Sequence, residues 1–309
     1  MSILVTGGAG FIGRWVVKKL LDEHEVIVLD NLINGGRDNI KEFIENPDFS
    51  FIHDDILNNK AVNAAFDDVD LCIHSAAQIN VQESLDSPEK AFKNNVIGTY
   101  NVLEACRKNG AKLVLMGTCM VYDIASLGSI NEDHSLKPAS PYAGSKVAAE
   151  ELAMSYFHGY GLPVVVVRPF NTYGPFQKSN MEGGVVSIFI RRYLEGKKLQ
   201  IYGDGTQTRD LLYVEDCADF IVKSALSERA VGEVINAGTG KDVSINDLAM
   251  MICNDEDMIE HMLHHHPQAE IQKLVCDNSK ARKLLGWEPE TSLKEGIEKT
   301  MEWIKQEPA

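Results

Sequence analysis

The chain has 309 residues, of which 44% are hydrophobic, and a formal net charge of −15 at pH 7. This length is sufficient for one large domain or two fused domains with a substantial core. The negative charge argues against non-specific nucleic-acid binding, and no apolar run approaches the ~20 residues of a membrane-spanning helix. Because the N-terminus enters a strand pattern without a basic leader, we expect a cytoplasmic protein without a signal peptide.

The N-terminal residues combine a strand, a glycine-rich turn and a helix. Residues 2–6 form a short buried-strand pattern, and Gly7, Gly10 and Gly13 precede an amphipathic run that ends near Leu21. This is the context that a dinucleotide-binding fingerprint requires, although the spacing is G-x-x-G-x-x-G. The first glycine permits the tight turn, the second lets a pyrophosphate approach backbone N–H groups, and the third lets the helix pack on the strand.

A second strand pattern, over residues 26–29, ends in Asp30, 17 residues after Gly13. An acidic residue there can accept hydrogen bonds from the adenosine ribose hydroxyls. Its charge would repel a 2′-phosphate, and no arginine follows directly. The sequence therefore predicts NAD as the cofactor in preference to NADP.

Strand and helix patterns alternate over the first 170 residues. Apolar strand patterns lie at 49–52, 71–73, 112–116 and 163–167, and long helical patterns lie at 88–109 and 142–160. This alternation predicts an α/β fold, a doubly wound parallel-sheet Rossmann fold. Both long helices carry more apolar surface than one sheet face needs, which favours packing between two copies of the chain.

The pattern loosens after residue 170 into a smaller C-terminal α+β lobe. A polar, glycine-rich segment at 178–184 predicts a loop over a site. Helices are expected at 185–194, 245–252, 279–285 and 293–305, and a strand at 199–202. We therefore place an NAD-binding Rossmann domain at 1–170 and a substrate-binding lobe at 171–309, with the chain re-entering the first domain around 206–240.

The cysteines and histidines do not indicate a metal site. Six cysteines are scattered without C-x-x-C pairing and are expected to be reduced thiols, mostly in the core. Residues 264–266 are three adjacent histidines before a proline, and adjacent side chains diverge. We interpret this segment as a loop and predict no metal.

Tyr142 and Lys146 are candidates for an acid–base pair. On a helix, the i,i+4 spacing places the phenol and the ammonium on one face. Neither group alone is a base at neutral pH, but a lysine cation and a nearby nicotinamide cation would favour the phenolate. The pair then serves as a base that deprotonates an alcohol while hydride leaves its carbon.

A series of motifs in order along the chain resembles the extended short-chain dehydrogenase/reductase family of NAD-dependent nucleotide-sugar epimerases and dehydratases. The resemblance covers nearly the whole chain. The matching segments are 7–13, 54–56, 74–77, 94–99, 121–122, 140–146, 168–171, 209–210 and 236–238.

The resemblance implies a set of cofactor contacts. Asp55 would meet the adenine amino group and Ile56 the adenine ring, while Ala76 and Ala77 would line the nicotinamide end. Asn95 resembles an asparagine that orders the strand–helix junction near the cofactor, and a purely structural role for it is the alternative. The complete set expected to bind NAD is Gly7, Gly10, Phe11, Ile12, Gly13, Asp30, Asn31, Asp55, Ile56, Ala76, Ala77, Asn95, Tyr142 and Lys146, the last of these also on the nicotinamide ribose.

The resemblance also implies the substrate contacts of a nucleotide-sugar-binding lobe. Thr118 matches the family's Ser/Thr, whose hydroxyl shares the sugar O4 proton with Tyr142. Asn171 resembles the residue that bonds the substrate phosphate, and Arg209 the basic group that neutralises the diphosphate. Asp277 lies where relatives contact the nucleotide ribose. The alternatives are a helix-cap acid for Asp277 and a salt bridge between lobes for Arg209.

The segment after Thr118 departs from the family pattern. Many 4,6-dehydratases carry Thr-Asp-Glu here, with a carboxylate that takes the C5 proton and an acid that protonates the departing C6 hydroxyl. This chain has Cys119 and Met120. Methionine transfers no proton, and cysteine is a poor base unless its pKa is lowered. This departure by itself favours a nucleotide-sugar 4-epimerase, which needs only Tyr142, Thr118 and NAD.

A narrower resemblance favours a dehydratase. Thr-Cys-Met at 118–120, together with 168–180 and 206–216, resembles N-acetylhexosamine 4,6-dehydratases of the legionaminic-acid and tunicamycin type. Cys119 would then be the general acid toward the C6 hydroxyl, with Tyr142 or another group removing the C5 proton. Packing is the alternative for Cys119 and the preferred role for Met120.

We therefore predict an NAD-dependent 4,6-dehydratase of UDP- or GDP-linked N-acetylglucosamine, with the homodimer of its family. Hydride return to C6 would give a 4-keto-6-deoxy sugar and return to C4 a 5,6-ene, and both products stay open. The alternatives are a 4-epimerase and a non-catalytic NAD-binding sensor.

Overall fold

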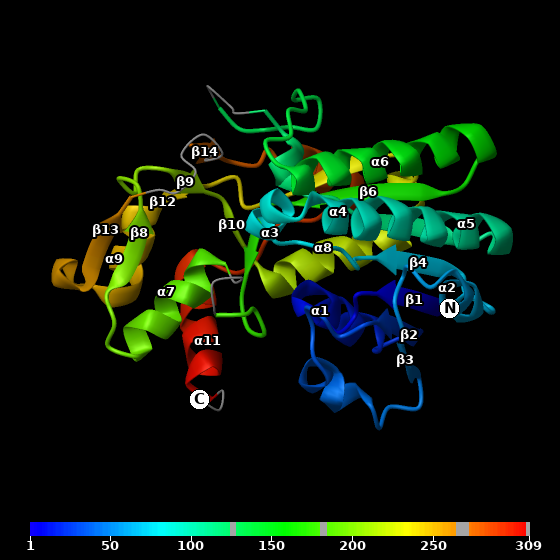
Figure 1. Ribbon diagram of the computed structural model, residues 1–309, viewed down its shortest axis with the longest axis horizontal. Coiled ribbons are helices and arrows are strands. Elements are labelled where there is room, and N and C mark those ends of the chain that lie inside the picture. Colours follow the sequence, from blue (N-terminus) through cyan, green and yellow to red (C-terminus); the bar gives the residue numbers. More distant parts are fainter. Residues whose placement is uncertain (124–127, 180–183, 264–271, 307–309) are drawn as a thin grey trace.

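A seven-stranded parallel sheet forms the centre of the structure, a computed structural model that describes residues 1–123, 128–179, 184–263 and 272–306 (Figure 1). The strands are β1 Ser2–Thr6, β2 Glu25–Asp30, β3 Phe49–His53, β4 Leu71–His74, β5 Lys112–Met116, β6 Val164–Pro169 and β11 Val234–Ala237. They lie in the order β11-β6-β5-β4-β1-β2-β3, and every neighbouring pair is parallel. This sheet confirms the predicted Rossmann fold.

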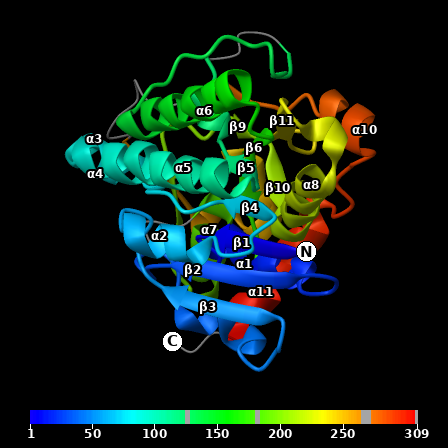
Figure 2. The same ribbon diagram turned by 90° about the vertical axis from the view of Figure 1, so that its right-hand side faces the viewer.

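Helices cover both faces of the sheet (Figure 2). They are α1 Phe11–Leu20, α2 Asn59–Ala65, α3 Val81–Asp86, α4 Pro88–Phe92, α5 Thr99–Asn109, α6 Pro141–Tyr160, α8 Val214–Leu226 and α10 Ser279–Leu285. Val165 and Val167 of β6 pack with α1 and α8, whereas Val164 and Val166 pack with α5 and α6. Burial on both faces explains why the strands are continuous apolar runs.

A second lobe lies beside the sheet in Figure 1. Its own core includes Phe189, Leu248 and Ile297. Its larger elements are α7 Val185–Leu194, β8 Leu199–Tyr202, α9 Ile245–Cys253, β13 Ile259–Met262 and α11 Leu293–Gln306. The remaining strands are short: β7 Asn171–Tyr173 pairs with β10 Leu211–Tyr213, and β9 Thr208–Arg209 lies between β12 Val243–Ser244 and β14 Lys273–Leu274.

Two features differ from the pattern in the sequence. The helical pattern over 88–109 is interrupted, because residues 93–98 form a π-helix between α4 and α5. Such turns are frequent at functional sites. The strand β11, at 234–237, and the helix α8 are not predicted as elements, and both belong to the central sheet layer. They lie within residues 206–240, where the chain is expected to re-enter the first domain.

None of the described helices is long and apolar enough to cross a membrane. Within the described ranges, no group of three or more metal-ligating side chains comes together. The three histidines at 264–266 lie outside those ranges. All six cysteines are buried free thiols.

Candidate active site

The turn after β1 brings the backbones of three segments together. Gly7 has a φ of 73°, its N–H donates to the Leu29 carbonyl at 2.9 Å, and a Cβ there would lie 2.6 Å from the Ala76 nitrogen. A Cβ on Gly13 would collide with the Gly7 carbonyl oxygen. These positions require glycine, and α1 begins directly at the turn. A backbone cradle at a helix N-terminus fits the pyrophosphate of a dinucleotide.

Asp30 lies at the end of β2, beside this turn. Its Oδ2 accepts the Ala9 N–H at 3.0 Å and its Oδ1 accepts the Leu32 N–H at 2.7 Å. Burial raises the pKa of the Asp30 carboxyl, and the two N–H groups oppose that rise. On the neighbouring strand end, Asp55 Oδ2 accepts a hydrogen bond from Asn31 Nδ2 at 2.7 Å. The structure thus brings together Asp30, Asn31 and Asp55, the three polar residues predicted to contact the adenosine part of the cofactor.

The apolar members of the predicted cofactor set surround the same turn. Phe11 and Ile12 open α1 and are partly buried, and Ile56 is buried in the core beside α5. Ala76 and Ala77 lie just after the end of β4. The backbone of Ala76 packs against Gly7 of the glycine turn. Small side chains therefore lie where a cofactor has to approach the backbone.

Asn95, within the π-helix, makes three buried hydrogen bonds. Its Oδ1 accepts the Gln78 N–H at 2.8 Å, and its Nδ2 donates to the Gln78 carbonyl at 3.0 Å and to Ser145 Oγ at 2.9 Å. Ser145 Oγ in turn donates to the Tyr142 carbonyl at 2.7 Å. Asn95 therefore connects the segment after β4 to the first turns of α6.

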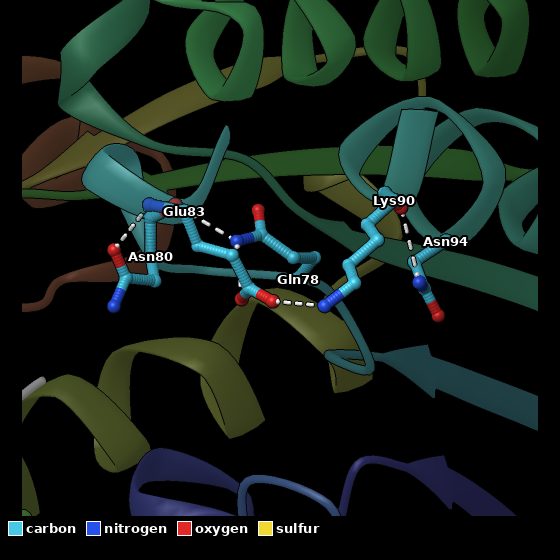
Figure 3. A network of polar contacts seen from close by, with 5 residues as sticks. All are labelled: Gln78, Asn80, Glu83, Lys90 and Asn94. Carbon is cyan, nitrogen blue, oxygen red and sulfur yellow. Dashed lines mark hydrogen bonds and ion pairs between the residues drawn. The ribbon is translucent and has the colours of Figure 1, made fainter. Parts of the chain in front are cut away.

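A polar network over residues 78–94 extends this connection (Figure 3). Gln78 Nε2 donates to the Asn80 carbonyl at 2.8 Å and to Glu83 Oε2 at 3.1 Å. Lys90 Nζ donates to Glu83 Oε1 at 2.7 Å, and Asn94 Nδ2 donates to the Lys90 carbonyl at 3.0 Å. The network joins α3, α4 and the π-helix, which pack against α6.

Tyr142 lies in the first turn of α6, which is capped by Ser140. Its N–H donates to Ser84 Oγ at 3.1 Å, and its buried phenol is hydrogen-bonded to Thr118. Thr118 Oγ1 also accepts the Met120 N–H at 3.2 Å, which fixes the segment after β5. The structure thus brings the phenol and the threonine hydroxyl of the predicted set together.

Lys146 is arranged differently from the expected phenol–ammonium pair. Its Nζ donates to the Met116 carbonyl at 2.7 Å. Burial lowers the pKa of Lys146 to about 8, against an opposing effect of Glu150. Burial also raises the pKa of Tyr142 to about 12, although the Thr118 hydrogen bond opposes the rise. The protein groups alone therefore keep the phenol protonated at neutral pH, and a phenolate requires further positive charge in the site.

Cys119 follows Thr118 in a buried 3-10 turn over Cys119–Val121. Burial raises the pKa of its thiol to about 12, with the Arg209 charge opposing this rise and Asp210 adding to it. The thiol also affects the pKa of Tyr142, so the two groups share one site. At neutral pH this thiol therefore holds its proton.

Two side-chain oxygens on the short strands β7 and β9 are buried without a hydrogen-bond partner among the described residues. They are Asn171 Oδ1, at the start of β7, and Thr208 Oγ1, on β9. Arg209 Nη1 donates to the Thr208 carbonyl at 2.8 Å, and its charge reaches Cys119. Arg209 therefore lies near the thiol, and the two unpaired oxygens are available to a polar ligand.

Two acidic residues border this region with different roles. Asp277 Oδ1 accepts the Ser279 N–H at 2.9 Å, and Asn278 between them is the N-cap residue of α10. The buried Asp210 joins three segments through hydrogen bonds, a structural role that the sequence does not reveal. It accepts hydrogen bonds from the Thr239 N–H and hydroxyl, the Gly240 N–H and the Cys276 N–H.

Sequence reasoning also misses two buried groups beneath the site. Glu150 and Arg168 form an ion pair, for which the available signal is the position of Glu150 four residues after the lysine of α6. His74 is held between the hydroxyls of Thr6 at 2.7 Å and Thr99 at 3.0 Å. Burial lowers the pKa of His74 to about 3, so the ring is neutral and structural.

Comparison with known proteins places this geometry in context. A family model described as the NAD dependent epimerase/dehydratase family matches residues 3–238. The UDP-glucose 4-epimerase of Mycolicibacterium smegmatis is 36% identical over 310 residues, which cover 99% of both chains.

Solved structures give the same result. The X-ray structure of Pal from Bacillus thuringiensis has 57% identity and a TM-score of 0.97, with 99% of both chains covered. A double mutant of the dTDP-glucose 4,6-dehydratase DesIV from Streptomyces venezuelae, with NAD and DAU bound, has 30% identity and a TM-score of 0.93, with 99% of this chain and 97% of that chain covered. Epimerases and dehydratases are thus both among the similar proteins, and overall similarity does not choose between them.

Proposed function

This chain belongs to the NAD dependent epimerase/dehydratase family, and within it we propose a 4,6-dehydratase of UDP- or GDP-linked N-acetylglucosamine. Its cofactor is NAD, as the sequence predicted. The proposal depends on one observation: the buried thiol of Cys119 shares the site of Tyr142 and Thr118. There it occupies a position where many 4,6-dehydratases have a proton-transferring acid.

The first step is oxidation at the sugar C4. NAD, when bound, supplies the hydride acceptor for this carbon. Tyr142 takes the O4 proton through its hydrogen bond with Thr118, which requires the phenol to be ionised first. The Lys146 cation on the Met116 carbonyl contributes positive charge toward that ionisation.

The second step is loss of water across C5 and C6. The C4 ketone makes the C5 proton acidic, so a base removes it while the C6–O bond breaks and a C5–C6 double bond forms. Cys119 gives its proton to the departing hydroxyl, which leaves as water.

Tyr142 is the favoured base for the C5 proton, once its phenol has released the O4 proton to solvent and is ionised again. Return of the hydride to C6 or to C4, with a proton to the neighbouring C5 or to O4, then completes the reaction. Asp210, the carboxylate near the thiol, already accepts four hydrogen bonds from the backbone and from a threonine hydroxyl, so it is committed to structure. The thiol itself holds its proton too tightly to act as a base. Tyr142 is the remaining candidate of the predicted catalytic set.

A nucleotide-sugar 4-epimerase is the second candidate. A relative named as a UDP-glucose 4-epimerase aligns over the full chain, and epimerisation needs only the phenol–hydroxyl pair and NAD. Cys119 would then be a packing residue, and it does pack with Val121, Tyr122 and Phe170. A non-catalytic NAD sensor fits less well, because binding alone does not require a buried phenol bonded to a threonine.

We also propose that the lobe over residues 171–309 binds the nucleotide sugar and that two copies of the chain form a homodimer. The unpaired oxygens of Asn171 and Thr208 support nucleotide-sugar binding at the lobe over 171–309. Tyr100 and Tyr160, 44% and 65% exposed on α5 and α6, support association of two copies through these helices. A monomer in light-scattering measurements would contradict that dimer.

Product mass separates the two candidate reactions. The protein is incubated with NAD and with UDP- or GDP-N-acetylglucosamine, and the products are weighed. Loss of one water supports the dehydratase, whereas an isomer of unchanged mass would establish the epimerase instead. The NMR spectrum then distinguishes a C6 methyl group, from a 4-keto-6-deoxy sugar, from the exocyclic methylene of a 5,6-ene.

A further inference from the structure

A buried ion pair lies one helical turn beyond Lys146 on α6. Glu150 follows Lys146 by four residues, so both side chains project from one face of the helix. Glu150 Oε2 accepts hydrogen bonds from Arg168 Nε at 3.0 Å and Nη2 at 2.6 Å. Arg168 is held in turn, because its Nη1 donates to the Tyr122 hydroxyl at 2.8 Å. The carboxylate of Glu150 is therefore fixed in position.

The second oxygen of Glu150 lies against the strand end that carries the site. Oε1 is buried without a hydrogen-bond partner among the described residues, and any side chain on Gly117 would collide with it. Gly117 connects Met116, whose carbonyl accepts the Lys146 ammonium at 2.7 Å, to Thr118. The carboxylate thus borders the segment that holds both the ammonium and the threonine hydroxyl.

Stability alone is a weak explanation for this pair. The attraction between two buried charges roughly offsets their loss of hydration, and apolar residues of similar volume often stabilise a core better. A buried oxygen without a partner adds to the cost. The position of the pair directly beneath the reacting groups offers another reason for its presence.

The charges around Lys146 identify what the carboxylate does. Burial lowers the pKa of Lys146 to about 8, and Glu150 opposes this effect. His74 is neutral, because burial lowers its pKa to about 3. Burial keeps the nearby phenol and thiol protonated as well. The titratable groups that interact with the Lys146 charge are Glu150 of α6 and His74 of β4, while Arg168 of β6 acts on Glu150. Tyr142 and Cys119 lie in the same site, where the thiol acts on the phenol.

We propose that Glu150 is a positioning residue that acts through Lys146: its fixed carboxylate keeps the buried ammonium charged and directed at the Met116 carbonyl. The inference rests on the proposed function, because it takes Lys146 as the cation that assists Tyr142. Without the carboxylate, only the effect of burial remains, so the Lys146 ammonium releases its proton at lower pH.

The test is a direct titration of Lys146 by NMR. The protein is saturated with NAD and labelled with ¹³C at the lysine ε-carbon, and the signal is assigned with Lys146→Met. Glu150→Gln should lower the measured pKa of Lys146 by about one pH unit. Glu151→Gln, at an exposed neighbour on the same helix, should leave it unchanged. An unchanged titration in Glu150→Gln overturns the proposal.

Arg168→Met separates the electrostatic role from a merely structural one. This variant removes the positive charge paired with Glu150 and keeps the Glu150 side chain, so at a pH where Glu150 is ionised the pKa of Lys146 should rise. If both single variants lower it, the ion pair only maintains the fold and the proposal is wrong. The double variant Glu150→Gln/Arg168→Met avoids an unpaired buried charge; Lys146 should still titrate below its wild-type value, and a wild-type value would contradict the proposal.

Failure of the proposed function gives a different result. The reaction class is read from the products, whereas the NMR titration needs no turnover. In an active enzyme, kcat should begin to fall at a lower pH on the alkaline side in Glu150→Gln, by the same shift as the Lys146 pKa measured by NMR. KM for the nucleotide sugar should stay constant. If the pH dependence of kcat does not shift with the Lys146 pKa, Glu150 does not act on the reaction through Lys146.

Discussion

The cofactor side and the substrate side of the active site satisfy their buried polar groups in different ways. On the cofactor side, Asn95 makes three side-chain hydrogen bonds and both ring nitrogens of His74 have threonine partners, although Gln78 Oε1 beside Asn95 is buried without a partner among the described residues. On the substrate side, Asn171 Oδ1 and Thr208 Oγ1 have no partner among the described residues. Buried polar atoms are nearly always paired, so we take the unpaired oxygens of Asn171 and Thr208 as candidate positions for a ligand.

This difference follows from how each side is built. The glycine turn, Asp30 and the Ala76 segment follow β1, β2 and β4, and neighbouring strands of a parallel sheet end at one edge. Backbone atoms from three segments therefore meet without a ligand. The substrate side is carried by β7 and β9, strands of three and two residues, whose backbone pairing fixes few side chains.

The largest effect is expected from Tyr142→Phe. Loss of the phenol removes the group that takes the O4 proton, so C4 oxidation should slow by about 10³-fold while NAD still binds. Single-turnover formation of NADH, followed by absorbance, measures the step. Tyr160→Phe, at a residue 65% exposed on the same helix, is the matched control and should have no effect. A wild-type rate for Tyr142→Phe would remove this residue from the mechanism.

Cys119→Ala should affect the second step alone. Without the acid, water loss should slow by about 10²-fold, and C4 oxidation should continue at the wild-type rate. Mass spectrometry of quenched reactions follows the dehydrated product, and NADH absorbance follows the oxidation. Cys253→Ala, which removes a buried thiol on α9, serves as the control. Dehydration at the normal rate would make Cys119 a packing residue and favour the epimerase.

The free energies of unfolding of two variants test whether the two sides of the site differ in how their buried polar groups are satisfied. Asn95→Ala leaves buried partners on Gln78 and Ser145 unpaired and should lower the free energy of unfolding by about 3 kcal/mol. Thr208→Val removes an oxygen that has no partner and should change it by less than about 0.5 kcal/mol. Urea unfolding without substrate gives both values. Equal losses would show that the two sides do not differ.

Asn171→Ala should weaken substrate binding with little effect on the cofactor. Loss of one hydrogen bond to the substrate should raise the Kd for the nucleotide sugar about tenfold, or about 1.4 kcal/mol. Calorimetric titration with UDP and with NAD separates the two affinities. An equal loss of NAD affinity would place Asn171 on the cofactor side.

His74 should make the cofactor side sensitive to acid. Its pKa is lowered in the folded protein to about 3, from about 6.5 when unfolded, so the unfolded chain binds the extra proton. The resulting stability is complete above pH 6.5 and should fall by about 1 kcal/mol between pH 6.5 and 5.5. In His74→Gln this dependence disappears, so the two unfolding curves should converge as the pH falls. Parallel curves over that range would mean that the ring already titrates in the folded state.

Much of the fold and the cofactor end is predictable from adjacent residues. The helices at 185–194 and 279–285 and the strand at 199–202 have the predicted bounds, because hydrophobic periodicity and glycines are local signals. The π-helix at 93–98 is not predictable in this way. Asn95 is held there by hydrogen bonds to Gln78 and Ser145, and Ser145 is distant in the sequence. Likewise β11 is recognisable only by its pairing with β6.

The sequence by itself determined the Rossmann architecture, the glycine turn with Asp30 and the candidates Tyr142 and Lys146, because each depends on residues close together in the chain. The tertiary structure decided their chemistry. It turned the Lys146 ammonium to the Met116 carbonyl, placed Arg209 near a thiol that keeps its proton, and buried the Glu150 carboxylate beneath Gly117. Burial and charge set these properties, and both come from segments far apart in the sequence.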